Sequence, residues 1–413
     1  MKLIFVTIAY PRSNSESNLY SDLMLEFAEH GHEVFVVSSI EKRFNKDTKL
    51  EATNGIKLLR IQTGNITANP NFLAKGIALL QFQNLIIKAI RKYFSHLTFD
   101  LIIYSTPPIQ YNRIITYLRK KTGASTYLLL KDIFPQNAID LGLIKKWNPV
   151  YWYFRMKEKQ TYRLSDTIGC MSIANVNYIL QHNKFLKPER VEVCPNSHRL
   201  SDRLDGNQRK SIRIKVRQVH SISNNDLLLI YGGNLGKAQG LVFLIQLLEA
   251  CKTNDRIRFL IVGSGTEYHW IEKHITSNQY NNVLLLKRVS TSDFRELVIA
   301  SDVGLIFLDP RFTIPNFPSR LNSYLEVGVP VIACTDKVSD VGNILEENGC
   351  GFKVISGDVQ QFIELINNFQ QDRQKLIQMS SSARMLFENS FTTEKSYSTI
   401  ISHFSKSIFS QNF

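Results

Sequence analysis

The chain lacks the features that define several other protein classes. Its five cysteines are odd in number, widely spaced and without a Cys-x-x-Cys pair, so neither a disulfide framework nor a zinc site is predicted, and a reducing cytoplasm fits best. No run of about 18 apolar residues is present, which argues against a membrane-spanning helix. The sequence contains no Asp-x-Asp motif and no pair of histidines at metal-ligand spacing. We therefore expect no metal and no other cofactor.

Positive charge, by contrast, is plentiful and unevenly distributed. The net charge is +14, and residues 1–200 contain 27 Lys and Arg against 15 Asp and Glu. The N-terminal half is therefore expected to face an anionic partner such as a membrane surface, a lipid diphosphate or nucleic acid, unless the charge only solvates the surface. With 44% hydrophobic residues, the chain can form two domains with separate cores.

Short apolar runs alternate with helical periods through both halves of the chain. The apolar start at 1–9 is too short for a signal peptide and predicts a first buried strand. Further strands are expected at 33–38, 56–61, 101–104, 126–130, 167–171 and 191–194, with a helix over 17–30. Beyond a polar stretch at 197–222, strands are expected at 227–231, 258–262, 282–286, 303–308 and 329–334, and helices from about 358 to 409. This alternation predicts parallel, doubly wound sheets in a first domain over 1–200 and a second over 222–390.

Three segments of the second domain are typical of a phosphate site. A glycine-rich turn, Gly232-Gly233-Asn234-Leu235-Gly236-Lys237-Ala238-Gln239-Gly240, and a second one, Gly263-Ser264-Gly265, each follow an expected strand. The third segment, Phe317-Pro318-Ser319-Arg320, reads as a helix start with a cation in its first turn. Backbone N–H groups in such turns can approach a phosphate, although glycine turns are also common packing devices. All three are expected at one edge of one sheet, which favours a single binding cleft.

Two features of the first domain have alternative interpretations. Asp132 directly follows the expected strand at 126–130, where it either contacts a ligand in the cleft or serves as a turn or N-cap carboxylate. The segment 72–97 is a basic amphipathic helix with Lys75, Lys88, Arg91 and Lys92. It either rests on an anionic bilayer or packs on the sheet with a basic face outward.

Taken together, these motifs resemble the family 4 glycosyltransferases of the GT-B fold, in particular a bacterial capsule and O-antigen subgroup that includes L-fucosamine transferases. The N-terminal half agrees through Asn-Leu-Tyr-Ser-Asp-Leu at 18–23, Gly-His-Glu-Val at 31–34 and Lys-Asp-Ile-Phe-Pro-Gln-Asn-Ala at 131–138. The resemblance implies two Rossmann-like domains that face a cleft. The first binds the acceptor, the second binds the nucleotide sugar, and a last helix at about 390–413 crosses back to the first domain.

The resemblance also implies roles for individual residues. The candidate catalytic residues are Asp132, Lys237 and Arg320. The candidate donor-binding residues are Gly232, Gly233, Asn234, Gln239, Gly240, Gly263, Gly265, Ser319, Asn322, Ser323 and Tyr324. The implied reaction moves a sugar, with retention, from a nucleotide diphosphate donor, preferably UDP-linked, to a lipid-linked saccharide. The enzyme would then lie at the inner face of the cell membrane, on an anionic surface, and would not bind nucleic acid.

The sequence also departs from the family pattern. Two glutamates of most family members fall on Pro315 and Ser323, and Glu326 lies about 300° round a helix from Ser323, too far to replace it. The family's diphosphate-contacting Arg and Lys fall on Asn234 and Gln239. The usual pocket histidine is missing from the loop Tyr-Ser-Thr-Pro-Pro at 104–108.

Three rival functions are weaker. A nucleotide-sugar epimerase of the same fold would need acid and base groups that the sequence does not offer. A nucleic-acid-binding protein would use the basic half, but no binding motif is present. A dehydrogenase is disfavoured because the first strand is followed by Tyr-Pro-Arg-Ser-Asn at 10–14, without a glycine fingerprint.

Overall fold

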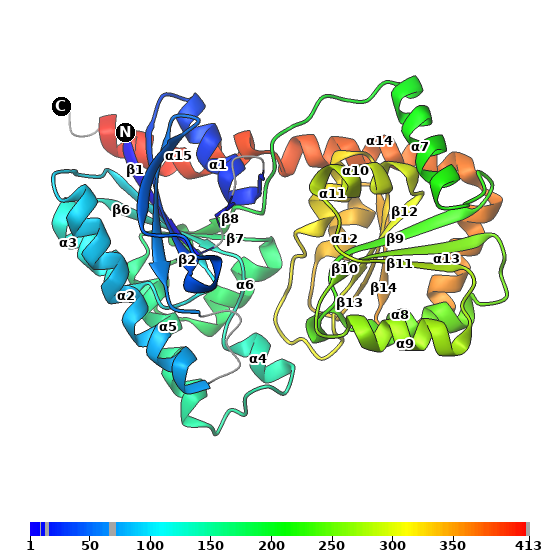
Figure 1. The fold of residues 1–413 in the computed structure, drawn as a ribbon, viewed down its shortest axis with the longest axis horizontal. Coiled ribbons are helices and arrows are strands. Elements are labelled where there is room, and N and C mark those ends of the chain that lie inside the picture. The colour runs from blue at the N-terminus through cyan, green and yellow to red at the C-terminus, as the bar shows by residue number, and fades with distance from the viewer. Residues whose placement is uncertain (9, 13–15, 66–71, 410–413) are drawn as a thin grey trace. The chain divides into compact units, whose positions relative to one another are not determined.

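The computed structural model describes residues 1–8, 10–12, 16–65 and 72–409 (Figure 1). The chain divides into two compact units. Unit 1 contains Met1–Pro135, Ile144–Arg199 and the chain from Thr393 onward, and unit 2 contains Gln136–Leu143 and Leu200–Thr392. Each unit is built around a sheet whose strands alternate with helices, so the doubly wound α/β architecture expected from the sequence is confirmed.

Unit 1 contains an eight-stranded sheet of order β3-β4-β2-β1-β5-β6-β7-β8, in which only the β3–β4 pair is antiparallel. Its strands are β1 (Lys2–Thr7), β2 (Glu33–Glu41), β3 (Lys49–Thr53), β4 (Ile56–Thr63), β5 (Leu101–Thr106), β6 (Ser125–Leu130), β7 (Thr167–Cys170) and β8 (Val191–Val193). Its helices are α1 (Leu19–Glu29), α2 (Phe72–Phe94), α3 (Asn112–Thr122), α5 (Pro149–Leu164), α6 (Ile173–His182) and α15 (Thr393–Phe409). The antiparallel strand β3 was not expected, because its sequence Lys-Leu-Glu-Ala-Thr has little apolar content.

The last helix returns to unit 1, as the family resemblance implies. Ile400 and Phe404 of α15 are buried in the same core as Phe5 and Phe27. The ring of Tyr397 packs edge-on against Phe27, with centroids 5.0 Å apart, and its hydroxyl lies 3.0 Å from a ring nitrogen of His32. These contacts fix α15 beside α1 (Figure 1).

Helix α2 packs on the sheet with one face and presents cations on the other. Phe82, Ile86 and Phe94 are buried, whereas Lys88 and Arg91 are exposed. Lys75 falls outside the side chains that the structure describes. Within the described residues, no helix is both long and apolar enough to cross a bilayer.

Unit 2 contains a six-stranded, wholly parallel sheet of order β11-β10-β9-β12-β13-β14. Its strands are β9 (Leu227–Asn234), β10 (Ile257–Ser264), β11 (Val283–Leu286), β12 (Val303–Phe307), β13 (Val331–Thr335) and β14 (Gly351–Ile355). Its helices are α4 (Gln136–Asp140), α7 (Gly206–Val219), α8 (Leu241–Ala250), α9 (Tyr268–Asn278), α10 (Thr291–Ala300), α11 (Arg320–Glu326), α12 (Val341–Glu347), α13 (Val359–Gln371) and α14 (Arg373–Ser390). Helices α8, α9 and α13 cover one face of the sheet, α10, α11 and α12 cover the other, and α14 contributes buried residues to both cores (Figure 1).

Because all six strands are parallel, the turns that follow β9, β10, β12 and β13 lie at the same edge of the sheet. The prediction that both glycine turns and the segment before α11 share one edge is therefore confirmed. The carboxyl edge of an open α/β sheet is where such folds bind their ligands.

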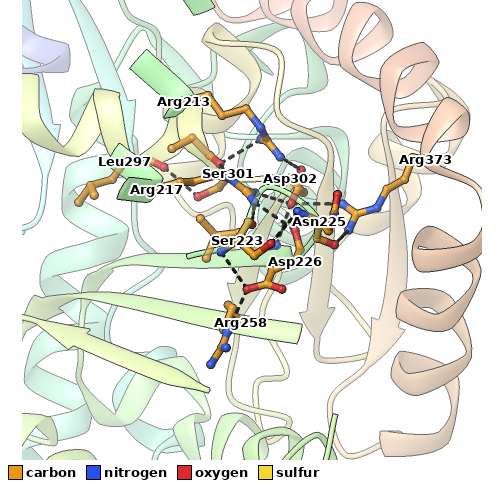
Figure 2. A network of polar contacts seen from close by, with 12 residues as sticks. Arg213, Arg217, Ser223, Asn225, Asp226, Arg258, Leu297, Ser301, Asp302 and Arg373 are labelled. Carbon is orange, nitrogen blue, oxygen red and sulfur yellow. Dashed lines mark hydrogen bonds and ion pairs between the residues drawn. The ribbon is translucent and has the colours of Figure 1, made fainter. Parts of the chain in front are cut away.

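The opposite edge of unit 2 is fixed by a buried ion-pair network. Figure 2 shows Arg213, Arg217 and Arg373 converging on the carboxylate of Asp302, at nitrogen–oxygen distances of 2.7, 2.8 and 3.4 Å. Burial by itself raises the pKa of Asp302, but the charges of Arg213 and Arg217 outweigh it and lower that pKa below its usual range. Helix α7, which lies within the polar stretch at 197–222, is thereby joined to the sheet and to α14.

Candidate functional site

The two glycine turns of unit 2 pack backbone against backbone. The N–H of Leu235 donates to the carbonyl of Ser264 at 2.9 Å, which joins the turn after β9 to the turn after β10. A Cβ on Gly263 would lie 1.9 Å from the Gly233 oxygen, and one on Gly265 would lie 2.2 Å from the Leu235 oxygen. Glycine is therefore required at 263 and 265 by close packing, which is the alternative that the sequence left open for these residues.

The turn after β9 also touches the loop after β12. Gly240 has a φ of +57°, and a Cβ there would lie 2.8 Å from the carbonyl oxygen of Leu308. The N–H of Asp309 donates to the carbonyl of Ala238 at 3.1 Å. Arg311 pairs with the Asp309 carboxylate at 2.7 Å; burial raises the pKa of Asp309, but this guanidinium lowers it below the usual range. The loop after β12 thus fixes the short 3₁₀ turn at Lys237–Gln239.

Tyr324 supports the first glycine turn from beneath. Its side chain is fully buried, and its hydroxyl accepts a hydrogen bond of 3.0 Å from the Gly232 N–H. The same hydroxyl lies 3.3 Å from the carbonyl oxygens of Ile230 and Leu305, to either of which it can donate. Tyr324 is therefore a core residue that supports the turn. It does not lie on the exposed side of the turn, where a donor-binding residue was expected. Asn322, on the same helix, is also buried.

Arg320 lies across the open face of the glycine turn. Its Nη2 donates to Oε1 of Gln239 at 2.8 Å, and its Cζ stands 4.6 Å from the centroid of the Tyr231 ring. A Cβ on Gly233 would lie 3.1 Å from Cζ, a tight contact that the guanidinium would relieve by shifting, and the φ of +133° at this position also favours glycine. The Nη1 atom is buried and has no hydrogen-bond partner among the described residues. A buried guanidinium N–H without an acceptor is energetically unfavourable, and an anionic oxygen is the acceptor that would stabilise it most.

The remaining candidates of unit 2 belong to the first glycine turn and to α11. Lys237 and Asn234 are exposed at the glycine turn, and Lys237 forms no ion pair among the described residues. Ser319 is exposed and precedes α11 without a side-chain capping bond, and Ser323 is half-buried within that helix. The structure therefore gathers Lys237, Gln239, Gly233 and Arg320 at one place, whereas Asn322 and Tyr324 lie beneath it.

Glu326 is not placed to act as either of the two glutamates that the resembled family carries. Its carboxylate accepts a hydrogen bond of 2.5 Å from the Ser201 hydroxyl and lies 3.5 Å from Nε of Arg295. It is therefore occupied by partners at the far end of α11, as its angular distance from Ser323 predicts.

Sequence reasoning missed the anchor of the segment that precedes α11. Asp336, which follows β13, accepts hydrogen bonds from the N–H of Ser339 at 2.7 Å and from its hydroxyl at 2.8 Å. The Ser339 hydroxyl in turn accepts from the N–H of Asn316 at 2.9 Å. Burial raises the pKa of Asp336, and these donated hydrogen bonds oppose that shift. The available signal was the position of an Asp directly after a buried strand.

The helix α4 belongs to this edge of unit 2 although it comes from the first half of the chain. Asp140 accepts hydrogen bonds from the backbone N–H and the hydroxyl of Thr313, at 2.8 and 2.9 Å. Arg311 reaches the Leu141 carbonyl at 3.5 Å. The loop between β12 and α11 is therefore held on both sides.

The candidate of unit 1, Asp132, lies half-buried just after β6. Its neighbour Lys131 donates to the carbonyl oxygen of Cys194 at 3.3 Å, and burial lowers the pKa of Lys131 to about 8. In the segment 104–108, where the resembled family has a histidine, Tyr104 belongs to β5 and is buried with its hydroxyl 2.7 Å from the Ser165 hydroxyl. This side chain is engaged in the core of unit 1.

Comparison with known proteins agrees with this geometry. The family model of the glycosyl transferases group 1 matches residues 212–386, which include both glycine turns and Arg320. WbjE of Pseudomonas aeruginosa, described as a probable glycosyltransferase, is 21% identical over 268 residues; the match spans 65% of this chain and 65% of WbjE, just under two thirds.

Several solved structures are similar over nearly the whole chain. Sucrose-phosphate synthase from Thermosynechococcus elongatus has a TM-score of 0.78 at 15% identity and covers 99% of both chains. HepE from Anabaena, solved with UDP and glucose, has a TM-score of 0.72 at 17% identity and covers 98% of this chain and 100% of its own. The fold is that of the GT-B glycosyltransferases, and the matched domain supports glycosyltransferase chemistry.

Proposed function

We propose that the protein is a retaining glycosyltransferase of family 4 that moves a sugar from a nucleotide diphosphate donor, preferably UDP-linked, to a lipid-linked saccharide. The reaction would belong to the synthesis of a capsule, an O-antigen or an exopolysaccharide, at the inner face of the membrane. The subgroup of L-fucosamine transferases is the one whose motifs the chain resembles.

One observation supports the donor site more strongly than the others do. The Arg320 guanidinium lies over Gly233 with one buried N–H that has no acceptor, at the ligand-binding edge of a sheet matched by the glycosyl transferases group 1 model. A diphosphate oxygen would supply the missing acceptor. The structure of the similar HepE contains UDP, which supports a nucleotide of this kind.

The same geometry accounts for the chemistry of the leaving group. As the bond between sugar and diphosphate breaks, negative charge grows on the diphosphate, and only interactions that strengthen at that point accelerate the reaction. Arg320 and Lys237 supply positive charge there, and the N–H groups of the glycine turn supply fixed dipoles. Because Tyr324 and Gln239 hold the turn and the guanidinium in place beforehand, little reorganisation is needed during the reaction. In unit 1, Asp132 is the proposed acceptor-side carboxylate.

A thermal shift screen tests the donor class. A ligand that binds the folded protein raises its melting temperature by mass action. UDP and one UDP-sugar should stabilise the protein, whereas uridine should not, because it lacks the diphosphate. The stabilising sugar nucleotide, radiolabelled in its sugar, is then incubated with a lipid extract, and label should move into the lipid fraction. Stabilisation by no nucleotide diphosphate, or no transfer from any stabilising donor, would contradict the proposal.

A further inference from the structure

A short segment of unit 1 exposes large apolar side chains. Trp147 and Trp152, two of the three tryptophans in the chain, are 75% and 61% exposed. Val150, Tyr153 and Met156 are each 46% exposed. Asn148 accepts a hydrogen bond from the Val150 N–H and Pro149 begins α5, so the segment is a well-formed helix start. Single exposed apolar residues are ordinary, but five within ten residues indicate a surface that binds something.

The charge around these side chains has one sign. Lys145 and Lys146 precede Trp147, and Lys157 and Lys159 follow Met156. The one carboxylate between 141 and 165 belongs to Glu158, which is buried and paired with Arg155. The segment therefore presents apolar side chains and cations, and no exposed anion.

A basic groove continues from this segment. It has a volume of about 860 Å³ and lies between α2, α3 and α5. Five cations line it, and no Asp or Glu is among its described lining: Lys88, Arg91, Arg113, Lys157 and Arg163. None of the five forms an ion pair with a carboxylate among the described residues. Ile87, Tyr117 and Leu164 give the groove apolar walls. Five unpaired cations in one groove attract an anion, and a phosphate group with an apolar attachment fits both kinds of wall.

The groove and the exposed segment form one surface because α5 contributes to both. Tyr153, Met156, Lys157 and Gln160 are spaced three and four residues apart and so lie on one side of the helix. The first two belong to the exposed apolar group, and the last two line the groove. One helix thus presents an apolar start and a basic continuation.

We propose that this face of unit 1 docks on an anionic bilayer. The aromatic side chains at 147, 152 and 153 enter the interfacial layer, and the groove between α2, α3 and α5 receives phosphate headgroups. Tryptophan and tyrosine favour the boundary between headgroups and acyl chains, and Lys and Arg beside them bind anionic lipids. A protein partner is the weaker choice. Charges of both signs fix the register of a protein–protein interface, and this surface has no anion to pair with the positive charges of a protein partner. The inference rests on the proposed function only in that a lipid-linked acceptor would require such a surface.

Sedimentation with vesicles tests the docking. Vesicles of equal parts phosphatidylglycerol and phosphatidylcholine should bind the protein at low salt, and vesicles of phosphatidylcholine alone should bind it much more weakly. The variant Lys88→Gln/Arg113→Gln/Lys157→Gln should bind the anionic vesicles roughly a hundredfold more weakly, at about fivefold for each charge. The control Lys210→Gln/Lys252→Gln/Lys273→Gln removes the same charge from unit 2 and should bind almost as wild type. Equal losses of vesicle binding in both triple variants would show that only the net charge of the protein matters. That result would overturn the assignment of headgroup binding to this groove.

Tryptophan fluorescence tests the depth of contact without any assay of activity. In the Trp270→Phe variant the remaining emission comes from Trp147 and Trp152, and it should shift to the blue when anionic vesicles are added. Trp147→Ser/Trp152→Ser should sediment about tenfold less than wild type, whereas Val242→Ser/Ile377→Ser, a matched pair exposed on unit 2, should not.

Two further outcomes would overturn the proposal. One is stabilisation by soluble glycerol phosphate or inorganic phosphate without vesicle binding, which would assign the groove to a free phosphate. The other is the absence of vesicle binding by a protein that UDP still stabilises. That second result would leave the proposed function unaffected, whereas vesicle binding by a protein that no nucleotide diphosphate stabilises would contradict the proposed function alone.

Discussion

Arg320 and Gln239 are joined by a hydrogen bond of 2.8 Å from Nη2 to Oε1, across the mouth of the first glycine turn of unit 2. The pair fixes a guanidinium whose other terminal nitrogen has no partner among the described residues. In the family that the sequence resembles, position 239 would be a cation. In this chain Gln239 is not itself a cation. It instead accepts a hydrogen bond from Arg320, the first residue of α11.

Replacement of either cation at the glycine turn should slow transfer. We expect Arg320→Ala and Lys237→Ala each to lower turnover by roughly ten- to a thousandfold, the range for losing one group that stabilises developing charge. Arg256→Ala, an exposed cation before β10 at the opposite end of the sheet, is the matched control and should leave turnover within twofold. Steady-state rates with the donor found in the thermal shift screen are the measurement. Normal rates in both folded variants would contradict the diphosphate assignment.

The second glycine turn should not tolerate a methyl group. In Gly263→Ala the new Cβ would meet the Gly233 oxygen at 1.9 Å, so one of the two turns must move. We expect a loss of about 1–3 kcal/mol in the free energy of unfolding, as for overpacked sites, together with weaker UDP binding. Gly206→Ala at the start of α7 is the control, because nothing lies within 4 Å of its added Cβ. Urea unfolding of the two variants should separate them clearly, and equal stability would show that the turns are not closely packed.

The Asp302 network predicts a dependence of stability on pH. Asp302→Asn leaves three guanidinium groups around a neutral amide and should cost about 3–5 kcal/mol at neutral pH. The pKa of Asp302 is lowered in the folded protein, so its contribution is complete above the unfolded pKa of about 4 and is lost as the pH falls below it. The difference between wild type and variant in thermal unfolding should therefore shrink below about pH 4. A constant difference down to lower pH would contradict the ion-pair account.

Transfer should survive removal of divalent cations. The sequence offers no Asp-x-Asp motif, and Arg320 and Lys237 provide positive charge where the diphosphate would lie, so the leaving group can be neutralised by the protein. We expect the transfer rate in EDTA to stay within a few-fold of the rate in magnesium. Loss of activity in EDTA and its recovery with magnesium or manganese would show that these two side chains are not sufficient.

Much of the fold could be predicted from the sequence because buried parallel strands are continuous apolar runs. The strands at 227–234, 257–264 and 303–307 are of this kind, and glycine turns mark the ends of the first two. Strand β14, Gly-Phe-Lys-Val-Ile, was missed because a short edge strand with a lysine resembles a loop. Helix α7 was taken for a polar boundary, since its role depends on arginines that only the folded network pairs with Asp302.

The candidate site could be predicted only in part. Spacing along the chain brought Gly233, Gly263 and Arg320 to one sheet edge, because the strand order follows from α/β topology. It did not distinguish Arg320, whose side chain turns toward Gly233, from Tyr324, whose hydroxyl supports Gly232 from below. Side-chain direction on a short helix depends on tertiary packing. The exposed tryptophans at 147 and 152 were likewise missed, since a sequence does not show which aromatic residues fail to be buried.

The measurement that tests the central claim most directly is calorimetric titration of UDP into wild type, Arg320→Ala and the control Arg256→Ala. The account predicts that wild type and Arg256→Ala bind UDP with equal affinity, and that Arg320→Ala binds it at least tenfold more weakly while remaining folded, because a charge-assisted bond to phosphate is worth about 1.5–3 kcal/mol. UDP binding of equal strength by all three proteins, or by none, would contradict the assignment of Arg320 and the glycine turn to the donor diphosphate.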